Sequence, residues 1–548
     1  MSCKSMDNRI AIHTLSLAHF LLLVFAGVAP AEAPPFWGKL QPGPHAIGFK
    51  SLWQLDYSRR YNMTFDDKTN YALGKAPRPI LINIWYPAKK SDDARAMKHG
   101  EYLEISSNDP QLAKFAAKLV EYDRGVIAKE VIGKAAKELT DREKSALSEF
   151  LDSATASIRN ATPAAGKFPL VIYHSGNGSS FEDNSVLCEF LASHGYVVFG
   201  SAFQQPRGTS FNVDNFHTRD FEFLIGYGKQ LENVDWNHIG VVGHSAGAHA
   251  ALTFRSQVDC AADAIVSLDT TQDYHGLKFP GWEPMIAAVT KNRRNFTCPV
   301  LMVADSHATF ELADLLQKSR RYYLTMHEMD HDDYISQGGL GKEWRLRVRD
   351  KVDATEKAAV ERTRRGYQAL CAYVLRFLDF ALKADAGAED FLAKQYRDTK
   401  LGDPNEPHVE MMAGGQTSTE AYKEASGVPP TPRQLRRFLR EQGSAKTIAL
   451  LKRFRKEAPT HPIYHEISEL FLVCDLIDEG KTQDALAFRD YYLESKLDCG
   501  KIFLRFAKGF HQGGSAAQAA GYYKRVLALD PSNKEAAAKL KELNDAKD

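Results

Sequence analysis

Residues 239–248 have the sequence IGVVGHSAGA, and this stretch decides the fold. An apolar run that predicts a β-strand leads directly into the pattern Gly-x-Ser-x-Gly, and the small residues after it predict the start of a helix. A strand-to-helix turn of this kind holds its central residue, Ser245, in a strained conformation with the hydroxyl exposed above the sheet. The alternative is a chance Gly-Ser loop. The preceding strand favours the first interpretation, in which Ser245 is a nucleophile.

Strand and helix signals alternate along much of the remaining chain. Further strands are predicted at residues 48–56, 80–87, 168–173, 196–203, 264–268, 300–304 and 321–326, mostly with helices between them. Short strands rich in Val, Ile and Leu that alternate with helices predict an α/β fold, a mostly parallel sheet with helices on both faces. We expect this domain to span residues 34–398.

A helical insert interrupts the strand series at about residues 100–160. It begins with Asp109-Pro110, an N-cap residue followed by proline in the first turn, and it contains the capping box of Thr140 and Glu143. Helices inserted between strands have to bury their apolar side against the rest of the domain. We therefore expect the insert to form a cap over the sheet.

The N-terminal residues have the pattern of a cleavable secretory signal. Lys4 and Arg9 precede an apolar run at about residues 15–28, and small residues follow at 29–33. We expect residues 1–33 to be removed and the protein to be exported, to a periplasm or as a secreted protein. No other segment approaches the length needed to span a bilayer, so no transmembrane segment is expected after cleavage.

The C-terminal quarter differs from the α/β region. Residues 399–432 are rich in Gly, Pro, Thr and charge without periodicity, which predicts a linker. Residues 433–548 are helical, and a motif that starts at Gly480 returns at Gly514, 34 residues later. That period resembles tetratricopeptide repeats, which would give the chain a surface for a protein partner. An ordinary helical bundle is the alternative.

The balance of charge excludes some partners. The chain has 548 residues with 70 basic and 69 acidic side chains, for a net charge of +1. It therefore offers no electrostatic reason to expect nucleic acid as a partner.

The cysteines fit no zinc-binding spacing. Cys260 and Cys298 each precede a predicted strand, and those two strands are candidates to be neighbours in the sheet. In an oxidising compartment the two sulfur atoms would then be able to form a disulfide, which is a hypothesis for the structure to test.

A serine nucleophile needs a base and an acid. A neutral imidazole takes its proton and a carboxylate orients that imidazole, and in this type of fold they follow in the order serine, acid, histidine. His331 comes after the last predicted strand, at the head of a short acidic and aromatic segment, and it is favoured over His327. The acid is Asp269 or Asp305, since each ends a strand, and spacing alone does not decide between them.

The two histidines also suggest another chemistry. His327 and His331 are four residues apart among carboxylates and would suit a metal ion, but no third ligand occurs at a familiar spacing. No metal or other cofactor is therefore expected.

Backbone amides are expected to stabilise the oxyanion. The first donor is the N–H of Ala246, directly after the nucleophile. The second should come from the glycine-containing loop at residues 173–178, although a plain turn or a glycosylation sequon at Asn177 is the alternative there.

Residues 43–393 resemble the α/β-hydrolases of the platelet-activating-factor acetylhydrolase and dienelactone-hydrolase type. The matching segments are Gly48-Phe49 with Asp56, Pro77-Arg78-Pro79-Ile80, Trp85-Tyr86-Pro87, His194-Gly195-Tyr196, Arg219-Asp220 and the turn around Ser245. The resemblance implies Asp269 as the acid and the Asn177 amide as the second oxyanion donor. Ser175 stands where the family has histidine, and Ala248 replaces a glycine. Both departures leave the fold intact, and the resemblance does not identify the particular ester that is cleaved.

Together these features predict an exported serine hydrolase that cleaves carboxyl esters through an acyl-enzyme. The expected substrate is a small-molecule or lipid-like ester. A peptidase, amidase or thioesterase on the same fold is one alternative. A catalytically inactive binding or scaffold protein that uses its repeats is the other.

Overall fold

The computed structural model of the chain describes residues 36–61, 76–91, 94–201, 216–272, 282–305, 308, 310–326, 329–394, 409–413, 422, 427, 429–430, 432–458, 462–464, 466–512 and 516–545. The predicted signal at residues 1–33 and His327 lie outside this part of the chain. Within it, no helix combines the length and the apolar composition that crossing a membrane requires.

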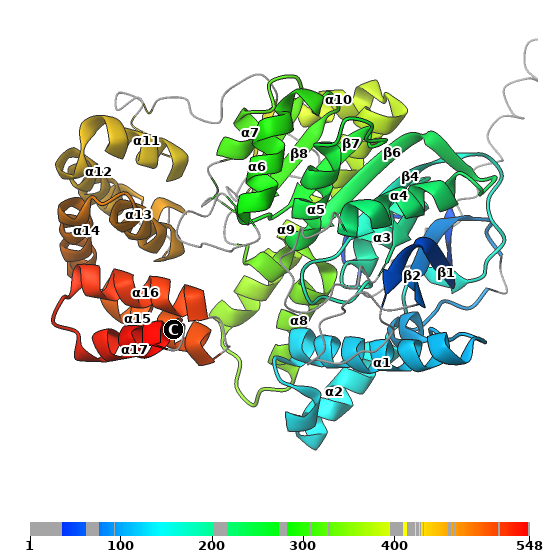
Figure 1. Cartoon of the computed structure of the whole chain (residues 1–548), viewed down its shortest axis with the longest axis horizontal. Coiled ribbons are helices and arrows are strands. Elements are labelled where there is room, and N and C mark those ends of the chain that lie inside the picture. Colours follow the sequence, from blue (N-terminus) through cyan, green and yellow to red (C-terminus); the bar gives the residue numbers. More distant parts are fainter. Residues whose placement is uncertain are drawn as a thin grey trace, which may run out of the picture.

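The described residues form a sheet in the order β10-β9-β8-β7-β6-β4-β5-β2-β1-β3 (Figure 1). Its strands are β1 (Ala46–Tyr61), β2 (Ala76–Ala88), β3 (Ser157–Arg159), β4 (Phe168–His174), β5 (Val197–Gly200), β6 (Val234–His244), β7 (Ala264–Leu268), β8 (Val300–Ala304), β9 (Arg321–Met326) and β10 (Val409–Ala413). The pairs from β5 through β4, β6, β7 and β8 to β9 are all parallel. The mostly parallel α/β sheet predicted from the sequence is therefore confirmed, and its arrangement is α/β-hydrolase-like.

The edge strand β10 was not predicted. Val409–Ala413 pairs antiparallel with β9, from Val409 opposite Met326 to Ala413 opposite Tyr322, in the segment expected to be a linker. A five-residue strand between Gly- and Pro-rich stretches has little periodicity of its own. Its pairing depends on the open edge of β9, which only the folded sheet provides.

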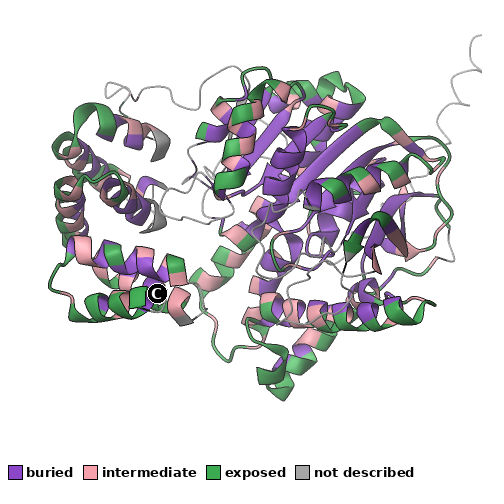
Figure 2. Cartoon of the chain, in the orientation of Figure 1, coloured by how far each residue is buried: buried purple, intermediate pink, exposed green. Residues whose placement is uncertain are grey.

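Helices cover both faces of the sheet, and period-two alternation of the strands supplies the two cores. In β4, Leu170 and Ile172 belong to one hydrophobic cluster, and Val171 and Tyr173 to the other. Against the first pack α4 (Phe216–Gly228), α5 (Ala246–Arg255) and α6 (Trp282–Asn292); against the second pack α3 (Ser185–Ser193) and α9 (Ala354–Lys383). Figure 2 shows the central strands mostly buried and the outer faces of the helices exposed.

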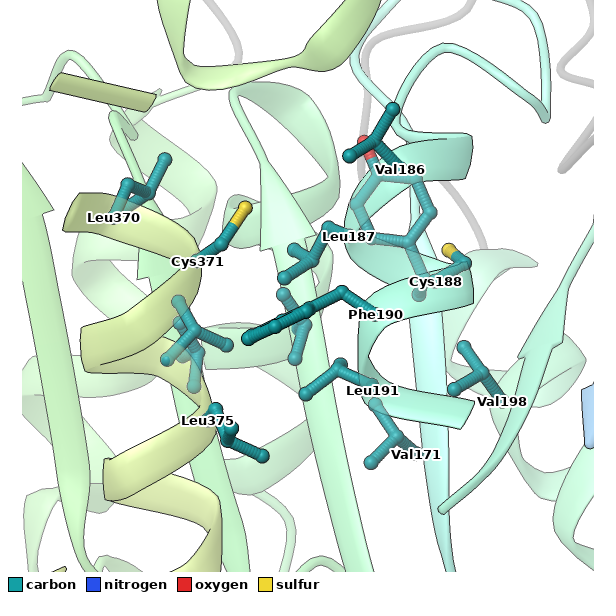
Figure 3. Packing of buried hydrophobic residues seen from close by; sticks show 14 of the residues in the cluster. Val171, Val186, Leu187, Cys188, Phe190, Leu191, Val198, Leu370, Cys371 and Leu375 are labelled. Carbon is teal, nitrogen blue, oxygen red and sulfur yellow. The ribbon is translucent and has the colours of Figure 1, made fainter. Parts of the chain in front are cut away.

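Figure 3 shows how the second core is filled. Cys371 and Leu375 of α9 point towards Leu187, Phe190 and Leu191 of α3, and all five side chains are buried. Close packing of this kind fixes α3 and α9 on the sheet.

The helical insert is present and begins as predicted. It consists of η1 (His99–Leu103), α1 (Pro110–Ile127), the π-helical turn η2 (Ala128–Ile132), η3 (Ala136–Glu138) and α2 (Asp141–Asp152). Asp109 accepts hydrogen bonds from the first turn of α1, and Thr140 and Glu143 form the capping box of α2. The insert packs with α8 (Ser336–Arg347), for example Phe150 against Trp344, and Figure 1 shows α1, α2 and α8 side by side.

The C-terminal region is helical, as expected. It contains α11 (Pro432–Gln442), α12 (Ser444–Glu457), η9 (Pro462–Tyr464), α13 (Glu466–Asp478), α14 (Thr482–Glu494), α15 (Cys499–Gln512), α16 (Ala516–Leu529) and α17 (Lys534–Asp545). These helices share a hydrophobic core, but Phe471 of α13 belongs to the core of the α/β sheet. Short elements complete the chain: η5 (Arg293–Asn295), α7 (Glu311–Asp314), η6 (His331–Tyr334) and α10 (Ala386–Leu392).

The hypothesised disulfide is not formed. Strands β7 and β8 are neighbours, as the hypothesis required, but Cys260 and Cys298 are free thiols. The side chain of Arg255 interacts with both thiols, and its Nε lies 3.2 Å from Cys298 Sγ. Both thiols therefore lie beside the guanidinium of Arg255.

A cluster of buried carboxyls lies where the helical insert, called the cap below, meets the segment before α3. Asp123 of α1 and Glu130 of η2 face Glu182 and Asp183, which precede α3. Burial raises the pKa of all four groups, and their mutual repulsion raises that of Asp123, Glu130 and Asp183 further. For Glu182 the pKa reaches about 7, and for Asp183 about 8. The folded chain therefore holds these carboxyls protonated at a pH where the unfolded chain ionises them.

This cluster makes stability fall with increasing pH. Because the folded state binds more protons, the free energy of unfolding decreases as the pH rises from the ordinary carboxyl values, 3.8 to 4.5, through about 8. Replacing Glu182 by Gln removes one of these titrations. We expect Glu182→Gln to raise Tm relative to the wild type by about 1–3 °C more at pH 8.5 than at pH 5, measured by thermal unfolding.

Glu121→Gln is the matched control, because Glu121 is exposed on the same helix as Asp123. Its effect on Tm should be the same at both pH values. An equal effect of Glu182→Gln at pH 5 and pH 8.5 would contradict the assignment of a raised pKa to this cluster.

Candidate active site

Ser245 lies at the turn between β6 and α5, and its backbone is strained. Its φ of 53° and ψ of −118° place it in a region that side-chain-bearing residues rarely adopt. The N–H of Ser245 donates to the carbonyl of Leu268 at the end of β7, at 2.9 Å, and this bond holds the turn against the neighbouring strand. The side chain is partly exposed. The sharp turn predicted for Ser245 is thus present.

Two glycines make this turn possible. A Cβ atom on Gly243 would lie 2.3 Å from the carbonyl carbon of Gly247, and one on Gly247 would lie 2.1 Å from the carbonyl oxygen of His174. Strand, helix and the loop after β4 therefore approach at distances that only glycine permits. This is the physical reason for the glycines of the Gly-x-Ser-x-Gly pattern.

The structure brings His331 and Asp269 together. Nδ1 of His331, at the start of η6, lies 2.5 Å from Oδ2 of Asp269, which follows β7 and is fully buried. Asp269 has a φ of 48°, and its N–H donates to the carbonyl of Val303 at 2.8 Å. The carboxylate is thus held in a fixed loop and accepts the imidazole N–H, which leaves Nε2 of His331 as the basic nitrogen.

Asp269 decides the protonation of His331. Burial opposes the charged imidazolium, but the hydrogen bond and the negative charge of Asp269, helped by Asp332, outweigh burial and raise the pKa of His331 above 6.5. An imidazole whose burial is opposed by a neighbouring carboxylate in this way is able to accept a proton near neutral pH.

Asp305, the other candidate acid, is buried after β8. The hydrogen bond of His331 goes to Asp269 and not to Asp305.

His331 is next to the turn that carries Ser245. The rings of His331 and His244 lie 4.8 Å apart, and His244 directly precedes Ser245. Among the residues that the structure describes, no hydrogen bond joins Ser245 Oγ to His331. Such bonds are often long or misaligned in enzymes without substrate and tighten when substrate binds.

The loop after β4 faces the same point. A Cβ on Gly176 would lie 3.4 Å from Cβ of Ser245, so this loop passes close to Ser245. The Gly176 amide faces the carboxyl of Asp183, whereas Asn177 is in an exposed turn. The N–H of Ala246 is at the first position of α5, where helix amides have no partner within the helix.

The cap contacts this loop. Tyr122 of α1 donates a hydrogen bond from its hydroxyl to the carbonyl of Gly178, at 3.1 Å, and Gly178 has a φ of 76°. Tyr173 donates to Asp183 at 2.7 Å on the opposite side of the loop. Neither contact is predictable from the sequence, because the pattern of a helical insert does not indicate which of its residues reaches the sheet.

No group of three or more His, Cys, Asp or Glu side chains with a metal-binding arrangement occurs in the described parts of the chain. His327, which would belong to such a group with His331, is not among those parts. The described part of the site contains a strained serine, a carboxylate–imidazole pair and the first amide of α5, which together suit nucleophilic attack on a carbonyl.

No protein-family description and no curated protein matches this chain. Among solved structures, the chain is similar to a ferulic acid esterase from Streptomyces cinnamoneus, with a TM-score of 0.43 and 18% sequence identity over 70% of this chain and 98% of that chain. The α/β-hydrolase-like fold described above rests on the strand order of this chain and on the turn at Ser245.

Proposed function

We propose that this protein is an exported serine hydrolase that cleaves carboxyl esters. One observation carries the proposal: a serine in a strained strand-to-helix turn stands beside an imidazole whose other nitrogen is bound to a buried carboxylate. Acyl transfer to a serine hydroxyl requires an imidazole as the base, a carboxylate that orients this imidazole, and donors for the oxyanion. His331 and Asp269 next to the turn of Ser245 are suited to the first two roles.

In the proposed reaction, Oγ of Ser245 attacks the ester carbonyl while Nε2 of His331 takes the hydroxyl proton. The negative charge of Asp269 stabilises the imidazolium that forms, and the amides of Ala246 and Asn177 donate to the oxyanion. The tetrahedral intermediate collapses, His331 returns its proton to the leaving alcohol, and an acyl-serine remains. Water then attacks with His331 again as the base, which releases the carboxylic acid and restores Ser245.

We also infer the character of the substrate and of the C-terminal region. The resemblance to acetylhydrolases and dienelactone hydrolases favours a small-molecule or lipid-like ester, which reaches Ser245 beside the cap. The C-terminal helices are proposed to be tetratricopeptide-like repeats that bind a protein partner.

Replacing Ser245 tests the nucleophile. Ser245→Ala should abolish labelling by a fluorophosphonate probe and lower kcat on p-nitrophenyl esters by roughly 10⁴- to 10⁶-fold, because no acyl-enzyme is able to form. Ser256→Ala, at the end of the same helix, is the control and should keep both labelling and activity.

Amide and thioester substrates measured beside the esters would identify a peptidase, amidase or thioesterase instead. A folded wild-type protein that the probe fails to label would refute the proposal and favour a binding protein.

The two candidate acids are separated by parallel substitutions. Asp269→Asn should lower kcat by about 10³- to 10⁴-fold, because the imidazole loses its orientation and the stabilisation of its charge. Because Asp269 is what raises the pKa of His331, burial would then dominate, and that pKa should fall below 6.5. Kcat/KM is lost as the pH drops through the pKa of the base, so the acid limb of the pH profile should move to lower pH.

Asp305→Asn should cause a much smaller loss and leave the acid limb in place. A larger loss from Asp305→Asn than from Asp269→Asn would reverse the assignment of the acid.

A further inference from the structure

Two histidines flank Ser245 and take no part in the proposed reaction. His244 directly precedes the proposed nucleophile. His249 lies in the first turns of α5, and its backbone N–H donates to the backbone carbonyl of Ser245. Their exposed fractions are only 2% and 6%. Most buried polar side chains form a hydrogen bond, and for these two rings the bonding partner indicates what each histidine does.

His244 contacts the backbone of the base. Its Nε2 lies 3.0 Å from the carbonyl oxygen of His331. A carbonyl only accepts hydrogen bonds, so Nε2 of His244 must carry the proton and donate it. The residue before the nucleophile is therefore bonded to the main chain of His331.

His249 makes the equivalent contact to the acid loop. Its Nε2 lies 2.6 Å from the carbonyl oxygen of Thr270, which follows Asp269. Asp269 and Thr271 both have positive φ, 48° and 62°, so Thr270 is enclosed by two strained residues. Strained backbone persists only where surrounding contacts hold it, and the bond from His249 is such a contact.

Both rings are uncharged at neutral pH. Burial, together with the nearby positive charge of His331, lowers the pKa of His244 to about 3 and that of His249 to about 4. This matters because a second positive charge beside His331 would oppose the imidazolium that forms during the reaction.

We propose that His244 and His249 are positioning residues, which bond the loops of His331 and Asp269 to the turn that carries Ser245. The proposal rests on the proposed hydrolase function. It predicts that the spacing of nucleophile, base and acid depends on two N–H donors that touch neither substrate nor the transferred proton.

Leucine and glutamine substitutions separate the hydrogen bond that each histidine ring donates from the packing of its side chain. His244→Leu and His249→Leu should each lower kcat on a p-nitrophenyl ester by about 10- to 100-fold, with KM changed by less than about threefold. Glutamine carries an N–H donor at a similar reach, so His244→Gln and His249→Gln should recover most of that loss. For His249→Leu, the acid limb of the pH profile should also move to lower pH, because the Asp269 loop no longer holds its carboxylate against His331.

His99→Leu is the matched control. His99 in the insert is 1% exposed, and within the described residues neither of its ring nitrogens has a hydrogen-bond partner. It packs between aromatic rings of Phe36, Tyr102 and Phe150. This variant should keep both kcat and the acid limb of the wild type.

Wild-type labelling by the fluorophosphonate probe comes first, because its absence would refute the hydrolase proposal and not this inference alone. With a labelled wild type, folded leucine variants of unchanged kcat would overturn the inference. Glutamine variants with a kcat no higher than that of the leucine variants would overturn it as well.

Should the leucine variants fail to fold, ¹⁵N spectra of the histidine-labelled wild type test the inference instead. Both rings should carry their proton on Nε2 and stay neutral from pH 5 to 8; a proton on Nδ1 or a titration in that range would overturn the proposal.

Discussion

The positive φ of Ser245 is the constraint on which the rest of the site depends. A serine accepts this conformation only where several contacts fix it together. The bond to Leu268 ties the turn to β7, and the close passage of Gly243 and Gly247 lets strand, helix and the loop after β4 meet at one point. Because Leu268 directly precedes Asp269, the hydrogen bond that holds Ser245, the proposed nucleophile, also fixes the start of the loop that carries Asp269, the proposed acid. This backbone hydrogen bond therefore links the positions of Ser245 and Asp269.

Electrostatics then distinguishes one imidazole from its neighbours. Burial lowers the pKa of His174, His244 and His249, whose rings bond to backbone carbonyls or, for His174, also to His217. His331 has the carboxylate of Asp269 at hydrogen-bond distance from its ring, and its pKa is raised despite burial. Burial opposes the charged form of each of these rings, and a negative charge this close to an imidazole is strong enough to reverse that effect. Among these four histidines, His331 is therefore the one whose raised pKa favours accepting a proton.

Local signals explain what the sequence was able to predict. The turn at Ser245, the strand before it, and the placement of Asp269 and His331 after later strands all follow from patterns a few residues long, and parallel strands bring their carboxyl ends to one edge. The choice between Asp269 and Asp305 depended on which loop reaches His331, which is a tertiary property. The contact of Tyr122 with Gly178 and the pairing of β10 with β9 also depend on the tertiary structure. His244 and His249 were visible in the sequence, but only their carbonyl partners reveal what they do.

The loop after β4 connects the chemistry to the cap. Gly176 of this loop passes close to Ser245, while Glu182 and Asp183, which follow it, belong to the buried carboxyl cluster shared with α1 and η2. Tyr122 holds the loop from the cap, and Tyr173 holds Asp183 from the sheet. A displacement of α1 would therefore move the carbonyl of Gly178, and with it the turn that contains the Asn177 amide. In the proposed reaction this amide is an oxyanion donor, and such a donor works only within a few tenths of an ångström of its acceptor position. Under that proposal the insert contributes to the geometry of the site.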